Sequence, residues 1–334
     1  MGGLSHDQKG HRMNIAFQKR LAQLVTAIIF VLLFAVASCF WKNFCSTRNV
    51  ADILSGTSVT GILAVGMTLV IFAGGIDLSV GSVAGFTTIF VAALVQNHGV
   101  HPFVAAICVL ILGAAFGALM GTIIHIFKQP PFLVTLAGMF FARGCAFWIS
   151  TQSIEIEHPI YQRLTTYSLP LGGDFGIPPT TLLMLAALLA GYIVAHHTRF
   201  GRNLLAIGGS EQSALLMGLP LGITKICAYA VCGFTAALGG LAGTLFTSSG
   251  NSRFGIGYEL DAIAIVVIGG TVLTGGRGHM LGTLSGILIF GTIGNIVIFA
   301  NLDSSWTRII IGLLLLAFIL LQRLLLRGTT LKST

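Results

Sequence analysis

The sequence predicts an all-α membrane protein of about ten transmembrane helices arranged in two related halves. Apolar runs long enough to cross a bilayer follow one another from Leu21 to Leu321. A spanning helix needs roughly 20 apolar residues, and only structures with closed backbone hydrogen bonding are stable in lipid. Hydrophobic residues make up 55% of the chain and charged residues 8%. The 43 glycines let helix backbones approach closely, which favours helix packing in a membrane.

Each apolar run defines one expected span, and short polar turns separate most of them. The runs cover residues 21–40, 57–74, 78–97, 103–126, 131–150, 178–197, 224–247, 259–275, 280–300 and 306–322. We therefore divide the chain into an N-terminal tail (1–20), a transmembrane domain (21–322) and a C-terminal tail (323–334).

Basic residues fix the expected orientation, because cytoplasmic loops carry an excess of Lys and Arg. With ten spans and a cytoplasmic N-terminus, twelve basic residues fall inside, and four fall in outside loops with Arg308 at an outer helix end. The inside set is Lys9, Arg12, Lys19, Arg20, Lys128, Arg199, Arg202, Lys225, Arg277, Arg323, Arg327 and Lys332. Both termini are predicted to be cytoplasmic. The basic residues form no stripe, so the net charge of +8 does not indicate nucleic-acid binding.

The longest outer loop, Thr151 to Pro179, is too polar for lipid and too long for a simple turn. It is either a cap over the helix ends or a docking platform.

The longest inside loop, Thr198 to Lys225, contains a short helix that Ser210 caps and Gly218 and Pro220 end. This helix either lies on the membrane lipid or docks into a groove on a cytoplasmic partner. Its candidate contact residues are Ser210, Glu211, Ala214, Leu215, Met217 and Gly218.

Two glycine-rich motifs place acids at helix breaks. In AVGMTLVIFAGGIDLSVGS, paired glycines precede Asp77 and Ser79, either of which can cap the next helix. An ionisable residue at such a break is also a candidate site in a transport pathway. In ELDAIAIVVIGGTVLTGGRG, Glu259 and Asp261 begin the eighth span. There they suit the helix dipole, and they equally suit hydrogen bonding to a polyhydroxylated solute at a pathway mouth.

The two motifs also resemble each other at an offset of 201 residues. Gly74-Gly75 and the segment Gly81 to Phe86 match Gly275-Gly276 and the segment Gly282 to Ile287. A repeated break of this kind is typical of transporters built from two related halves, although chance matches are common in a glycine-rich chain.

Enzyme and metal signatures are missing. The chain has no GxxxxGK[ST], HExxH or GxSxG motif and no Cys/His cluster, so no catalytic site, bound cofactor or metal is expected. The ionisable residues inside spans are few, chiefly His125 and Arg143, both expected near helix ends. An ion-driven carrier needs buried carboxylates, which are scarce here. The composition therefore favours a pathway powered by something else.

Together the motifs resemble the membrane permease subunits of bacterial sugar ABC importers of the ribose type, over nearly the whole chain. They are AVGMTLVIFAGGIDLSVGS, TRFGRNLLAIGGSEQSALLMGL and ELDAIAIVVIGGTVLTGGRG. TLAGMFFARG and SIEIEHPIY look most like the galactofuranose-type members. The resemblance implies an inner-membrane protein that carries a monosaccharide, without an ATPase site of its own. Its implied partners are a cytoplasmic ABC ATPase, a periplasmic sugar-binding protein and a second permease subunit, identical or paralogous.

The resemblance also implies that the Ser210 to Met217 helix is the coupling helix that docks on the ATPase. It assigns no sugar-contacting role to Asp77, Ser79, Glu259 or Asp261, which stay candidate pathway residues. The alternative from another class is a stand-alone channel or an ion-coupled secondary carrier for a small polar solute.

Overall fold

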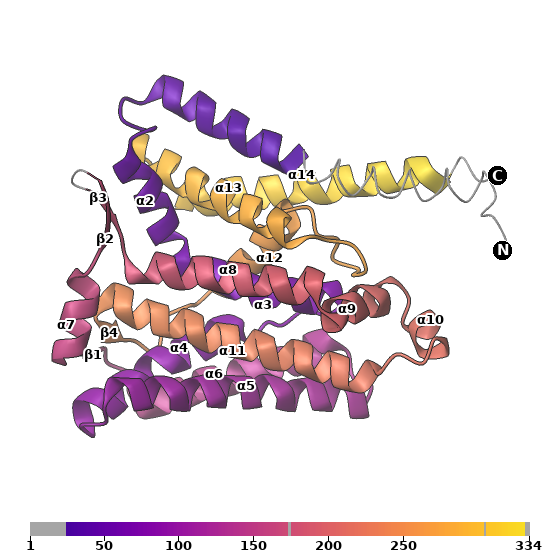
Figure 1. Cartoon of the computed structure of the whole chain (residues 1–334), viewed down its shortest axis with the longest axis horizontal. Helices are drawn as coiled ribbons and strands as arrows, with labels where there is room; N and C mark the ends of the chain where they lie inside the picture. The colour runs from indigo at the N-terminus through magenta and orange to yellow at the C-terminus, as the bar shows by residue number, and fades with distance from the viewer. Residues whose placement is uncertain (1–24, 173–174, 304, 331–334) are drawn as a thin grey trace.

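Most helices of the computed structural model run roughly along the long axis of the molecule (Figure 1). The structure describes residues 25–172, 175–303 and 305–330. After a first helix, Val25–Phe40, the helices are α2 (Thr47–Gly56), α3 (Ser58–Phe72), α4 (Val80–Ala92) with the π-turn η1 (Ala93–Asn97), α5 (Pro102–Ile126), α6 (Pro131–Ile149), α7 (Pro159–Thr166), α8 (Pro179–His197), α9 (Arg199–Gly209), α10 (Glu211–Leu216), α11 (Leu221–Thr247), α12 (Tyr258–Ile268), α13 (Met280–Phe299) and α14 (Ser305–Thr330). The strands are β1 (Ile154–Glu155), β2 (Leu169–Gly172), β3 (Phe175–Ile177) and β4 (Ser249–Gly250).

The ten predicted spans are not all confirmed. Within the described residues, six helices are long and apolar enough to cross a membrane, and α2 with α3, bent by 53°, makes a seventh candidate. Val25–Phe40 and Ser305–Leu320 are shorter apolar segments. The run 259–275 is the clear exception, because α12 has 11 residues and ends at Ile268. A helix of that length spans about 16 Å, roughly half of the hydrocarbon core.

The longest helix, α11, forms the centre of the bundle and packs against α5, α3 and α4. Glycines make the α5–α11 contact close. A Cβ at Gly117 would overlap the carbonyl group of Tyr229, and one at Gly233 would overlap the carbonyl group of Gly113. Small residues at such positions let two helix backbones touch, which is the main source of helix association in lipid.

The two ends of the bundle differ, as Figure 1 shows. One end, here named the α7 end, carries α7 and all four strands, with β1 paired to β4 and β2 paired to β3, both antiparallel. Tyr161 of α7 is buried and its hydroxyl lies 3.0 Å from Oγ1 of Thr244 on α11. Burial raises the pKa of Tyr161, so the hydroxyl stays protonated in this contact. The loop 151–179 thus caps helix ends, and its predicted docking role stays a prediction.

The opposite end, the α10 end, brings the two predicted helix breaks together. The N–H of Gly276 donates to the carbonyl oxygen of Phe72 over 3.0 Å. Gly208 of α9 lies between the two breaks, since a Cβ there would overlap the same Phe72 carbonyl and the nitrogen of Gly276. Deeper in the bundle, the hydroxyls of Thr68 and Thr283 are 2.9 Å apart. The two glycine pairs that match at an offset of 201 residues, Gly74-Gly75 and Gly275-Gly276, are therefore neighbours in space.

The predicted tails are covered only in part. The N-terminal tail (1–20) lies outside the described residues. At the other terminus, α14 continues to Thr330, past the predicted span end at residue 322.

Candidate functional site

A non-helical segment runs back into the bundle from the α7 end. After α11 ends at Thr247, residues 249–257, here named the re-entrant segment, lie against α4 in antiparallel order. Gly250 lies against Thr88, and the carbonyls of Phe254 and Gly255 lie against Gly85 and Gly81. Because glycine at positions 81 and 85 leaves room for a backbone, the segment follows α4 for two helical turns.

The segment lies along Val80–Asn97, a stretch of helix that is long and apolar enough to cross a membrane. The apolar sequence of α4 and η1 ends at Gln96, which marks the polar boundary of this span. With a helix rise of 1.5 Å per residue, Thr88 lies about 12 Å and Gly81 about 22 Å below that boundary. Non-helical backbone at such depth is stable only where protein buries it or where it lines a water-filled space. The sequence predicts an outer loop for these residues, and the structure corrects that position.

Arg143 of α6 fixes the re-entrant segment. Its Nη1 donates to the carbonyl oxygens of Ser252 and Phe254 over 2.6 and 2.7 Å. Thr88 adds a second anchor, because its hydroxyl donates to the Asn251 carbonyl over 3.0 Å and accepts the Asn251 N–H over 3.1 Å. Arg143 lies 12 residues after Pro131 in the 19-residue α6, so it is an interior residue of that helix. The sequence predicts Arg143 near a helix end, which is wrong, and no spacing rule links this residue to residues 252–254.

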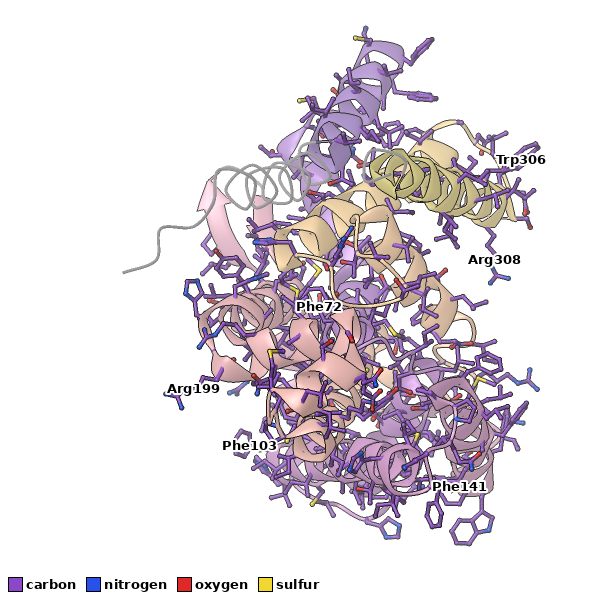
Figure 2. The ribbon with its side chains drawn as sticks, turned by 90° about the vertical axis from the view of Figure 1, so that its right-hand side faces the viewer. Phe72, Phe103, Phe141, Arg199, Trp306 and Arg308 are labelled. Atoms are coloured by element: carbon purple, nitrogen blue, oxygen red, sulfur yellow. The ribbon has the colours of Figure 1, made fainter. Side chains whose placement is uncertain are left out.

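Glu259 and Asp261 lie in the first turn of α12, where the re-entrant segment ends. The sequence placed both acids at the outer end of a full span, and α12 instead begins beside Gly81. The Glu259 carboxylate faces Gly81 and is attracted by the charge of Arg143; its Oε2 has no hydrogen-bond partner among the described residues. Asp261 is attracted by the charge of Arg308. Figure 2 shows Arg308 projecting from α14 on the side of the molecule where Phe141 of α6 also lies.

Asp77 and Ser79 belong to a different cluster. Both are fully buried at the break between α3 and α4, and Oδ1 of Asp77 accepts the Ser79 N–H over 2.9 Å and the Ser79 hydroxyl over 2.7 Å. Ser79 is the N-cap residue of α4, but its side chain makes no capping hydrogen bond to that helix, and Asp77 binds Ser79 within the turn. Tyr229 and Cys232 of α11 face the Asp77 carboxylate. Asp77 thus has other neighbours than the Arg143–Glu259 pair, and its role in transport stays a prediction.

The predicted short inside helix is confirmed as α10. Ser210 caps it by accepting the Ser213 N–H over 3.2 Å, and Gly218 follows its end with a φ of +75°. Glu211 pairs with Lys225 of α11 over 2.7 Å. Ala214 is buried against the bundle with Ile207 and Leu221.

The opposite face of α10 is apolar and open. Leu215, Leu216 and Met217 are exposed by 63%, 84% and 66% of their surface. Three neighbouring large apolar side chains of this kind mark an interaction surface. Beside them, at the same end, a pocket of about 400 Å³ lies between Gly208 and Gly209 of α9 and the loop that carries Arg277.

Comparisons with known proteins agree with this architecture. The family model described as "Branched-chain amino acid transport system / permease component" matches residues 49–319. The chain is 45% identical to the inner membrane ABC transporter permease protein YjfF of Escherichia coli (strain K12), over 92% of this chain and 93% of that protein. It is 37% identical to the ribose import permease protein RbsC of the same organism (90% and 94% covered). It is 36% identical to the fructose import permease protein FruG of Bifidobacterium longum (95% and 94% covered). No solved structure matches the chain.

Proposed function

We propose that this chain, which belongs to the family of permease components that includes the sugar ABC permeases, forms the translocation pathway of an ATP-driven monosaccharide importer. The chain is a multi-pass membrane protein and a transport component. The proposal rests on the sequence similarity of this chain, over nine-tenths or more of its length, to permeases named for ribose and fructose. The family description names amino acids, and the sugar assignment rests on these relatives. The cargo that we propose is galactofuranose or a related pentose or hexose.

The proposal implies three protein partners outside this chain. A cytoplasmic ABC ATPase supplies ATP hydrolysis, a periplasmic binding protein delivers the sugar, and a second permease, identical or paralogous, completes the pathway. The open apolar face of α10 supports the ATPase role, because a coupling helix needs a surface that inserts into a groove of its partner. ATP-driven closure of the ATPase pair would then move the paired permeases between outward-open and inward-open states.

A stand-alone channel or an ion-coupled carrier is the alternative, and purification decides between the classes. The chain should be purified with its ATPase and binding protein, and ATP hydrolysis should be measured with a panel of pentoses and hexoses. We expect one sugar to stimulate hydrolysis through the binding protein. Uptake by this chain alone, without an ATPase, would establish the alternative.

Both termini and α10 are expected on the cytoplasmic side, and the α7 end on the periplasmic side. Single cysteines should be placed at Ser210 and Ser168 in a background without native cysteines. A membrane-impermeant thiol reagent applied to intact spheroplasts should label the Ser168 site only. Labelling of the Ser210 site would invert the topology.

The candidate acid Asp261 is expected to act in transport. In Asp261→Asn, the exposed Arg308 loses its nearby opposite charge, and we expect uptake to fall by about tenfold, equal to about 1.4 kcal/mol. Asp52→Asn is the control, because Asp52 is exposed on α2 near the α7 end. Uptake and membrane level should be measured together. Normal uptake by Asp261→Asn would leave this acid only a helix-dipole role, worth under about 1 kcal/mol.

A further inference from the structure

Arg253 lies in the middle of the re-entrant segment, and its side chain is open. Its backbone is fixed, because its N–H donates to Oδ1 of Asn251 over 2.8 Å. The residue is exposed, and its guanidinium makes no hydrogen bond or ion pair with any residue that the structure describes. Arg143, by contrast, binds the carbonyls on either side of Arg253 and has Glu259 as a charge partner. Of the two arginines at the segment, Arg143 of α6 is therefore compensated by hydrogen bonds and an opposite charge, and Arg253 of the segment itself is not.

The depth of Arg253 restricts what its side chain faces. It lies between Asn251, which binds Thr88, and Phe254, which lies against Gly85. From the polar boundary at Gln96, this is a depth of about 12 to 16 Å along α4. An arginine at such depth is unfavourable against lipid and is normally found facing a water-filled cavity or a charge partner.

We infer that Arg253 is a sugar-contacting residue of the translocation pathway. A guanidinium presents five N–H donors in a planar fork, which suits neighbouring hydroxyl oxygens of a neutral polyhydroxylated solute. Arg143 is the positioning residue, because its bonds to the carbonyls of residues 252 and 254 fix the backbone from which Arg253 projects. This inference rests on the proposed function, since it requires a sugar in the pathway.

The first test compares Arg253→Gln and Arg253→Lys in the reconstituted complex with ATPase and binding protein. Arg253→Gln should lower the kcat/KM of sugar uptake by at least about tenfold, the range for loss of one charge-assisted hydrogen bond. Binding-protein-stimulated ATP hydrolysis should stay unchanged, and Arg253→Lys should restore part of the uptake. Arg48→Gln is the matched control, because Arg48 is an exposed arginine of α2 that lies outside the re-entrant segment and the loop 151–179, and it should transport normally.

The second test probes access and needs no transport. In a background without native cysteines, Arg253→Cys should react with a charged, membrane-impermeant methanethiosulfonate reagent. Leu189→Cys should not react, because Leu189 is an apolar side chain, 62% exposed, in the middle of a helix long and apolar enough to cross a membrane, where we expect lipid to cover it. Protection of Arg253→Cys in the assembled complex would mean that a second permease copy covers the residue, and it would overturn the inference.

The outcomes separate the two proposals. If the wild-type complex shows neither sugar-stimulated hydrolysis nor uptake, the proposed function fails. If the wild type transports and Arg253→Gln transports equally well, the proposed function stands and the inference fails. In that case the guanidinium reaches lipid headgroups or a charged group of the second permease instead of the sugar.

Discussion

Replacing Gly117 by valine is expected to prevent the bundle from assembling. Gly117 of α5 faces the Tyr229 carbonyl of α11, and even one added carbon overlaps that backbone group. The clash is with backbone, so no side-chain rotation relieves it, and α5 and α11 must move apart. This contact joins two long helices at the centre of the molecule. Overpacking a tight interior costs about 1 to 3 kcal/mol or more, and a backbone clash belongs at the upper end.

The measurement is the amount of folded protein in the membrane, followed by its thermal aggregation temperature in detergent. Gly144→Val is the control, because Gly144 lies in α6 with no atom within 4 Å of the added carbon. Both variants add the same apolar volume to a membrane helix. If Gly117→Val reaches the wild-type level and melting temperature, the close α5–α11 contact contributes little to stability.

Leu215→Asp is expected to abolish ATP-driven uptake while leaving the chain inserted. Leu215 is exposed on α10 and contributes to its open apolar face, so the substitution disturbs nothing inside the chain. In a docked complex the new carboxylate would lose its water, which costs several kcal/mol unless it becomes protonated. A loss of 4 kcal/mol would weaken binding by about a thousandfold.

Co-purification of the ATPase with the variant provides the measurement, with membrane level as the reference. Gln212→Asp is the matched control, since Gln212 is an exposed polar residue of the same helix. Retained ATPase binding and uptake in Leu215→Asp would assign α10 to the membrane surface instead.

The hydropathy of the sequence predicted the positions of the helices well, but it predicted one helix to be too long. Nine of the ten predicted runs coincide with helices or helix pairs that extend over most of the run, because continuous apolar sequence in lipid has few alternatives to helix. The run 259–275 is equally apolar, yet its helix ends at Ile268 because Gly270 adopts a φ of +87°. Hydropathy does not register such a backbone change, so a half-length helix followed by a loop reads as one full span.

The candidate site was predicted only in part. The short α10 helix was predicted from Ser210, Gly218 and Pro220, because capping chemistry is local in sequence. The re-entrant segment was not, because its position depends on bonds from Arg143, more than one hundred residues away. Its sequence, NSRFGIG, is polar enough to be taken for an outer loop. Only tertiary contacts place it along α4.

The position of Gly208 between the two helix breaks has a mechanical consequence. Helix α10 follows α9 closely in sequence, so a displacement of α10 is passed to α9 and its residue Gly208. Gly208 contacts Phe72 at one break and Gly276 at the other. The Gly276–Phe72 hydrogen bond ties those breaks together, so both receive the same displacement at once. Asp77 lies within the first break, and the second break follows α12, which carries Glu259 and Asp261. A partner that docked on α10 and displaced it would therefore act on both breaks together, and through the Glu211–Lys225 pair on α11 as well.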